Sequence, residues 1–261
     1  MIFKHELKAN IKTFLIWTII IASMNFGFML MYPSLQEAMN EAMAAYQNMG
    51  SFTVAFGMDR LSMSEPLGFY GVYVGAILSL GGSLFSAIIG TGILSKEEGG
   101  HTSEFLFTLP YTRVNIVLQK SAAVFSIILA FDMVNLLLGL LSFPLIQADL
   151  HMKEILLYHT AQFVMHLEIA AIGILFSAFT KKINLGGGLG IALLLYFMDI
   201  MSRVLEQLEF TKYITPFYYA NAADIMINQK IDPLLLGIGI GITLLCIISG
   251  TWYYNRRDLA S

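Results

Sequence analysis

The chain has 261 residues, of which 57% are hydrophobic and only 13% are charged, and its net charge is −3. Soluble domains carry about 25% charged residues, so this composition cannot coat a soluble surface. High hydrophobicity with low charge excludes a disordered protein, and the single cysteine, Cys246, excludes a disulfide-stapled secreted domain. The slightly negative charge excludes the basic footprint of a nucleic-acid-binding protein. The class that remains is a polytopic membrane protein.

Six stretches are long and apolar enough to cross a bilayer, which takes about 20 mostly apolar residues per helix. The alternation over about 10 residues that marks the strands of a membrane β-barrel is not seen. We therefore predict an all-α polytopic membrane protein with six transmembrane helices and a single transmembrane domain over residues 1–261. The predicted spans are 13–32, 70–94, 121–146, 157–180, 185–201 and 233–254.

Basic residues predict the orientation, because cytoplasmic loops carry an excess of Lys and Arg. Ten of the fifteen basic residues fall on one side if the N-terminus is cytoplasmic. We therefore expect both termini in the cytoplasm. The ten basic residues on the cytoplasmic side are Lys4, Lys8, Lys12, Lys96, Arg113, Lys120, Lys181, Lys182, Arg256 and Arg257.

The segment from Phe3 to Lys12 sets apolar residues against lysines and predicts an amphipathic helix on the inner membrane face, before the first span. The alternative for this segment is a simple topology anchor. Both long outer loops, 33–69 and 202–232, are also predicted to have structure. In the second, aromatic residues around Pro216 predict segments that dip back into the outer leaflet, with an interfacial aromatic belt as the alternative.

Helical spacing marks part of the first outer loop. One face carries Leu35, Met39, Ala42, Tyr46 and Met49. We favour a helix packed on the outer mouth of the bundle, and the alternative is a Met-rich surface that contacts substrate or partner.

The inner loop over residues 95–120 has the features of a docking element. Gly99 and Gly100 end the preceding helix, and residues 101–109 are expected to form a short helix that Pro110 stops. Its apolar residues Phe105, Leu106 and Leu109 would face the cytoplasm, which is typical of helix-in-groove recognition. The weaker alternative is simple re-entry at the membrane interface.

Polar residues inside the predicted spans leave two interpretations open. An acid at the bilayer centre costs about 2.5–3.5 kcal/mol on insertion scales, so it faces the bundle or a wet cavity. Asp132 and Asn135 begin a polar stripe on the third span, and His166 and Glu168 lie near mid-depth in the fourth. They either line a translocation route or bond neighbouring helices together, and the second interpretation is slightly favoured. Asp199 is expected to pair locally with Arg203 at i+4.

Small residues in the second span indicate that another helix approaches closely, in a dimer seam or within the chain. They are Gly75, Ser79, Gly82, Ser83, Ser86 and Gly90. No metal site is predicted, because His159, Gln162 and His166 share a helix face but lack a third close ligand. The sequence also lacks the phosphate loop G-x-x-x-x-G-K-[ST], and no catalytic residue is expected.

The whole chain resembles the membrane subunit of an ABC transporter, of the type-2 exporter permease class. Six spans, the basic helix before the first span and the inner loop carry the resemblance. In that loop, Glu97-Glu98, the run from Gly100 to Leu106, Thr108-Leu109-Pro110, Arg113 and Lys120 look like the family signature. The tail from Tyr254 to Leu259 is similar to the family's basic end. His101 departs from the usual small or basic residue.

The resemblance implies that the inner loop holds a coupling helix that docks on a separate ATPase subunit. ATP and Mg would then bind that partner, with no cofactor in this chain. Two permeases, identical or paralogous, would work with two ATPases, and the outer segment from Thr215 to Asp224 would gate the exit. The residues implied at the ATPase contact are Glu98, Gly100, Thr102, Glu104, Phe105, Leu106 and Pro110.

The sequence therefore predicts an ATP-driven exporter permease of the bacterial plasma membrane that does no chemistry itself. One alternative is an ion- or proton-coupled secondary transporter that uses Asp132 and Glu168. Another is an intramembrane hydrolase that uses the glutamates and histidines. No residue selects among peptide, lipid, drug and ion substrates, or between a homodimer and a heterodimer.

Overall fold

The computed structural model describes residues 2–46, 50–100, 102, 108 and 110–257. Within these residues the chain is helical and contains no strand. Six helices are long and apolar enough to cross a membrane, which confirms the all-α polytopic prediction. They contain α1 (Ile2–Tyr46), α4 (Gly75–Gly92), α7 (Arg113–Leu145), α8 (Met152–Phe179), α9 (Leu185–Val204) and α11 (Pro233–Arg256). The second of these spans runs over Pro66–Gly92, because two short helical elements lead directly into α4.

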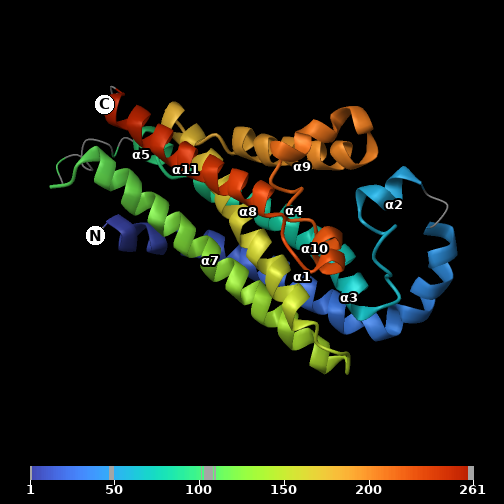
Figure 1. Ribbon diagram of the computed structural model, residues 1–261. Helices are drawn as coiled ribbons and strands as arrows, with labels where there is room; N and C mark the ends of the chain where they lie inside the picture. Colours follow the sequence, from blue (N-terminus) through green and yellow to red (C-terminus); the bar gives the residue numbers. More distant parts are fainter. Residues whose placement is uncertain (1, 47–49, 101, 103–107, 109, 258–261) are drawn as a thin grey trace.

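Shorter elements connect the long helices at both ends of the bundle. The two termini lie at the same end, close to α5 and the start of α7, whereas α2, α3 and α10 lie toward the other end (Figure 1). This arrangement is the one that an even number of spans requires. The short elements are α2 (Ser51–Ala55), α3 (Pro66–Phe69), the π-helix η1 (Tyr70–Val74), α5 (Ser95–Gly99), the 3₁₀ helix η2 (Glu206–Tyr213) and α10 (Ala222–Asn228).

The prediction of a separate amphipathic helix before the first span is wrong, because this segment is the beginning of α1. Helix α1 runs for 45 residues without interruption and continues past Pro33. Its first turns pack on α7, where Ile2 is buried against Ile116. No glycine or proline separates residues 3–13, so the helix continues, and burial against α7 holds the segment on the bundle.

The outer part of α1 accounts for the helical pattern predicted in the first outer loop. Leu35 and Met39 pack against the hydrophobic core, and the Tyr73 hydroxyl contacts the Met39 sulfur at 3.8 Å. The favoured prediction of a packed helix is therefore confirmed for these two residues. The side chains of Ala42 and Tyr46, and all of Met49, lie outside the described residues.

Helices α4 and α8 approach each other through the predicted small residues. A Cβ atom at Gly90 would lie 2.5 Å from the carbonyl oxygen of Ala170, and one at Gly173 would lie 3.0 Å from the amide nitrogen of Thr91. A Cβ atom at Gly82 would lie 2.3 Å from Nε2 of His166. These glycines therefore serve packing within the chain.

The outer segment after α9 folds back against the long helices. The Thr215 hydroxyl donates to the carbonyl of Leu195 in α9 at 2.8 Å, and Gln162 of α8 donates to the carbonyl of Ala220 at 2.8 Å. The aromatic ring of Phe217 is buried in the same hydrophobic cluster that joins the six long helices. Hydrogen bonds to α8 and α9 thus fix the position of this segment.

We expect Gly90→Ala to destabilise the protein by about 1–3 kcal/mol, because the new methyl group would overlap the backbone of α8. Gly92→Ala is the matched control, since the nearest atom to its Cβ is a side-chain carbon of Ile183 at 3.8 Å. The free energy of unfolding of Gly92→Ala, measured in detergent, should lie within about 1 kcal/mol of the wild-type value. Equal stability of the two variants would contradict the close contact.

Candidate functional site

The structure describes both ends of the inner loop but not its tip. Glu98 lies in α5, Gly100 ends that helix, and Thr102 follows. The Thr102 amide and hydroxyl donate to the carbonyl and the carboxylate of Glu97, at 2.8 and 2.6 Å. Gly100, Thr102 and Pro110 are exposed. The other predicted contact residues, Glu104, Phe105 and Leu106, lie outside the described residues, as does His101.

Lys120 of α7 is a buried ammonium group beneath this loop. Its Nζ donates to Glu6 Oε1 at 2.5 Å, to Glu97 Oε1 at 2.8 Å and to the carbonyl of Ile93 at 3.0 Å. The Lys120 side chain is 0% exposed and that of Glu6 is 1% exposed. Lys96 also pairs with Glu6. The hydrogen bonds of one ammonium group therefore join α1, α5 and α7.

The charges around Lys120 balance. Burying a charged side chain costs several kcal/mol unless it is paired and hydrogen-bonded, and here two lysines face two carboxylates. Burial acts to raise the pKa of Glu97, but attraction to Lys120, with hydrogen bonds from Lys120 and Thr102, holds that pKa below its usual range. The Glu97 carboxyl group is therefore ionised at neutral pH and held in place by its hydrogen bonds to Lys120 and Thr102.

A second ion pair ties the loop to the C-terminal end of the chain. Arg257 donates to Glu98 Oε2 at 2.6 Å, to the carbonyl of Ala178 in the last turn of α8 at 2.6 Å and to the carbonyl of Thr180, just after α8, at 3.1 Å. Arg113 donates to the carbonyl of Arg257 at 2.6 Å. The Glu98 side chain is only 6% exposed, so here it anchors the loop from inside.

Sequence reasoning missed Glu6 and gave Arg257 only a general place in a basic tail. Glu6 is the one acid among the lysines of the first twelve residues, and that isolation was the available signal. Its partner Lys120 lies 114 residues away, so no helical spacing connects the two.

Within the bundle, the predicted polar residues separate into three bonded pairs. His166 Nδ1 lies 2.9 Å from Oδ1 of Asp132, and Asn135 accepts a hydrogen bond from Asn25 of α1 at 3.3 Å. Glu168 instead accepts a hydrogen bond from Tyr219 at 2.9 Å. Asp132 and Glu168 thus have different partners. Among the described residues, no group of three His, Cys, Asp or Glu side chains is placed to hold a metal ion.

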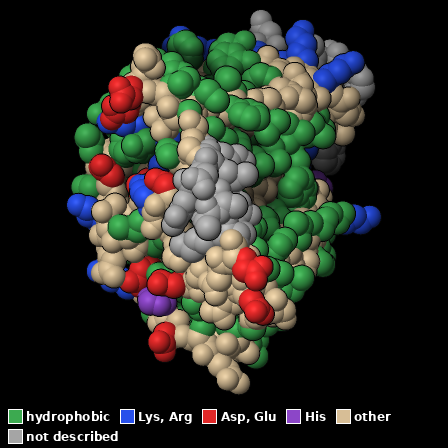
Figure 2. All heavy atoms as spheres, turned by 90° about the vertical axis from the view of Figure 1, so that its right-hand side faces the viewer, with side chains coloured by type: hydrophobic (Ala, Val, Ile, Leu, Met, Phe, Trp, Pro, Cys, Tyr) green, Lys and Arg blue, Asp and Glu red, His purple; other side chains and the backbone are tan. Residues whose placement is uncertain are grey.

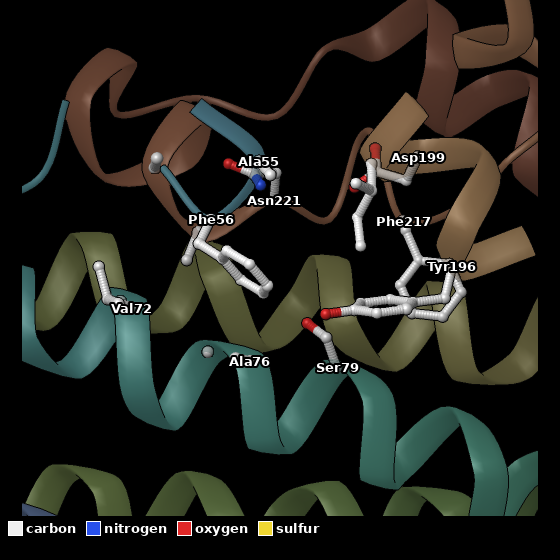
Figure 3. A pocket seen from close by; sticks show the side chains of 14 residues that line it. Ala55, Phe56, Val72, Ala76, Ser79, Tyr196, Asp199, Phe217 and Asn221 are labelled. Carbon is white, nitrogen blue, oxygen red and sulfur yellow. The ribbon is translucent and has the colours of Figure 1, made fainter. Parts of the chain in front are cut away.

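A small pocket lies in the outer half of the bundle, between α4, α9 and the segment before α10. Phe56 points toward α4, and the hydroxyl groups of Tyr196 and Ser79 point toward each other (Figure 3). Phe217 and Asn221 complete this part of the lining. Its volume of about 50 Å³ holds a few water molecules, whereas a drug-sized ligand needs about 300 Å³ or more. The pocket is closed to such a ligand in this conformation.

An ionic cluster holds the outer end of the pocket together. Arg203 Nε donates to Asp199 Oδ1 at 3.1 Å, which confirms the predicted local pair, and Arg203 Nη1 donates to Asp224 Oδ2 at 2.9 Å. Arg60 reaches Asp224 from the first outer loop at 2.5 Å. Figure 2 shows acidic side chains exposed on this end of the molecule. The cluster joins three outer segments.

The chain matches a known protein family over nearly its whole length. The family model described as ABC-2 family transporter protein covers residues 1–259, which include the six long helices and the loop between α4 and α7. The family resemblance drawn from the spans and the loop signature is therefore confirmed. No curated protein sequence matches the chain.

We expect Lys120→Met to destabilise the protein by about 3–5 kcal/mol, because it leaves the carboxylates of Glu6 and Glu97 buried without their shared partner. Lys153→Met is the matched control, since Lys153 makes an exposed hydrogen bond to Gln229 at the other end. Unfolding in mixed detergent micelles measures both. If Lys120→Met loses no more stability than the control, the buried ion pairs of Lys120 do not contribute to folding.

Glu97 should make the loop base sensitive to acid. Its pKa in the folded protein is below the value of about 4.3 for a free glutamate. The stability it contributes is therefore complete above pH ~4.3 and is lost as the pH falls through the lower folded value. We expect Glu97→Gln to lower stability at neutral pH and to reduce the loss on acidification. Parallel acid-unfolding curves for the variant and the wild type would contradict this role.

Proposed function

We propose that this chain, which belongs to the ABC-2 transporter family, is the permease subunit of an ATP-driven exporter that works with separate ATPase subunits. Membership of the family makes it an integral membrane permease of an ABC transporter. The direction of transport, the coupling to ATP, the pairing with a second permease and the bacterial plasma membrane as its location are the parts that we propose.

The observation that carries the proposal is the buried ionic base of the inner loop. Lys120 joins the loop to α1 and α7, and Arg257 joins it to the end of α8. A force applied to the loop would therefore move the inner ends of several spans together. A loop that only connected two helices would not need ion pairs buried to this degree.

The tip of the loop is the proposed ATPase contact. Gly100, Thr102 and Pro110 are exposed on either side of it. We propose Glu104, Phe105 and Leu106 as the contact residues, as the family resemblance implies. The sequence has no phosphate loop of its own, so we place ATP and Mg on the partner. In this mechanism, closure of the ATPase pair moves two coupling helices together, and the spans then change access.

We propose that substrate passes between two permease copies or a permease and its paralogue. The pocket of about 50 Å³ between α4 and α9 is too small for a drug-sized substrate, so the passage of such a substrate there would require α9 and the segment from Thr215 to Asp224 to move outward. The ionic cluster of Arg203 with its two aspartates would have to rearrange in that step. The separate partners of Asp132 and Glu168 give no support to a continuous proton relay through both residues.

The coupling contact is tested by Phe105→Asp and Glu104→Arg, which place a charge in the apolar contact or reverse a charge beside it. We expect either variant to lower strongly the amount of ATPase subunit that co-purifies with the tagged permease. The rate of ATP hydrolysis in proteoliposomes should fall strongly as well. Glu209→Arg is the control, because Glu209 is an exposed acid at the other end. If the ATPase binds both variants as it binds wild type, the proposed interface is wrong.

A further inference from the structure

An acid and a base face each other inside the apolar bundle. His166 Nδ1 of α8 lies 2.9 Å from Oδ1 and 3.1 Å from Oδ2 of Asp132 in α7. His166 is 0% exposed and Asp132 is 4% exposed. Within the described residues, neither forms an ion pair with a lysine or an arginine. The charge of each group must therefore be balanced by the other.

The surroundings of the pair contain few other titratable groups. Residues 70–92 of the second span, 13–36 of α1 and 233–251 of α11 contain no Asp, Glu, Lys, Arg or His. Tyr158 and His159 lie about two helical turns before His166 on α8 and are titratable groups close enough to interact with the pair. His159 is itself bonded to the Tyr70 hydroxyl at 2.7 Å.

The number of protons on the pair sets its net charge. With one titratable proton the pair is neutral, either as carboxylate with imidazolium or as carboxylic acid with neutral imidazole. With none it carries −1, and with two it carries +1. A net charge without a partner is strongly disfavoured in the membrane interior. The closed bundle therefore favours one proton on the pair.

The surroundings of the second ring nitrogen of His166, Nε2, disfavour the state with one proton on the pair. In both neutral forms Nε2 must carry a hydrogen, because Nδ1 shares the other hydrogen with Asp132. Nε2 has no hydrogen-bond partner in the part of the chain that the structure describes, and it faces Gly82 of α4, where a Cβ atom would lie only 2.3 Å away. A buried donor without an acceptor is unfavourable. Losing the proton removes the unpaired N–H but leaves a buried carboxylate charge.

We propose that Asp132 and His166 form a proton-binding site that holds one proton while α4 covers His166. When α4 and α8 separate, the Nε2–H bond breaks, the proton passes to water as hydronium, and one hydrogen remains between Nδ1 and the carboxylate. Water then solvates the negative charge of Asp132. When the helices close, hydronium returns the proton to Nε2. Contact between α4 and α8 is therefore favoured at lower pH, independently of whether ATP drives transport.

The position of the hydrogen tests the site directly. Nitrogen-15 NMR of histidine-labelled protein in lipid nanodiscs distinguishes protonated from unprotonated ring nitrogens, and the spectrum of His166→Gln assigns the signal. We expect Nε2 of His166 to carry a hydrogen at pH 7. An unprotonated Nε2 at that pH, with its hydrogen only on Nδ1, would overturn the proposal.

Linkage between proton binding and folding gives a second test. Free Asp and His have pKa values of about 3.9 and 6.5, so the unfolded pair holds about a quarter of a proton at pH 7 and almost none at pH 8. The folded pair, in this proposal, holds one. The folding equilibrium constant should therefore fall up to about tenfold per pH unit in this range. Asp132→Asn should lose that contribution, because an amide with neutral imidazole binds no proton there.

Ser142→Ala is the matched control for this measurement. Ser142 is also fully buried on α7 and bonds only to the carbonyl of Gly139 at 2.7 Å, so its loss changes stability without removing a titratable group. This variant should keep the pH dependence of wild type. Equal pH dependence for wild type and Asp132→Asn in the unfolding equilibrium would overturn the proposal, and the NMR measurement decides it if Asp132→Asn fails to fold.

Discussion

The ammonium group of Lys120 must find all its hydrogen-bond acceptors inside the protein, because the side chain is 0% exposed. It finds them on α1, on α5 and at the end of α4, which fixes the inner ends of these helices relative to α7. Arg257 extends the constraint to the end of α8. Electrostatic pairing in a low dielectric thus fixes the region from which the loop between α5 and α7 projects.

The same constraint recurs at other depths of the bundle. Buried polar groups bond to other segments of the chain, as Asp132 does with His166, Glu168 with Tyr219 and Arg203 with Asp224. Between these bonds, α4 and α8 meet at glycines that leave no room for a side chain. Any rearrangement of the spans would therefore have to break several specific contacts together, which favours two discrete states over a continuous deformation.

Sequence patterns predicted what depends on neighbours along one helix. Hydropathy gave the six spans, and i+4 spacing gave the pair of Asp199 with Arg203. Glu6 with Lys120 and Asp132 with His166 are separated by 114 and 34 residues, so only the packing of helices brings them together. The fusion of the amphipathic segment with α1 escaped prediction because helical periodicity does not mark where a helix ends.

Whether α5 and the start of α1 move as one unit can be measured in the proposed complex with an ATPase subunit. Spin labels at Lys8→Cys and Gly99→Cys, with the native Cys246 replaced by Ala, report the separation of α1 from α5. The separation should stay the same with and without ATP, and its distribution should broaden when Lys120→Met is added. If the separation changes with ATP, or if its distribution is the same with and without Lys120→Met, then Lys120 does not hold α5 and the start of α1 together as one unit.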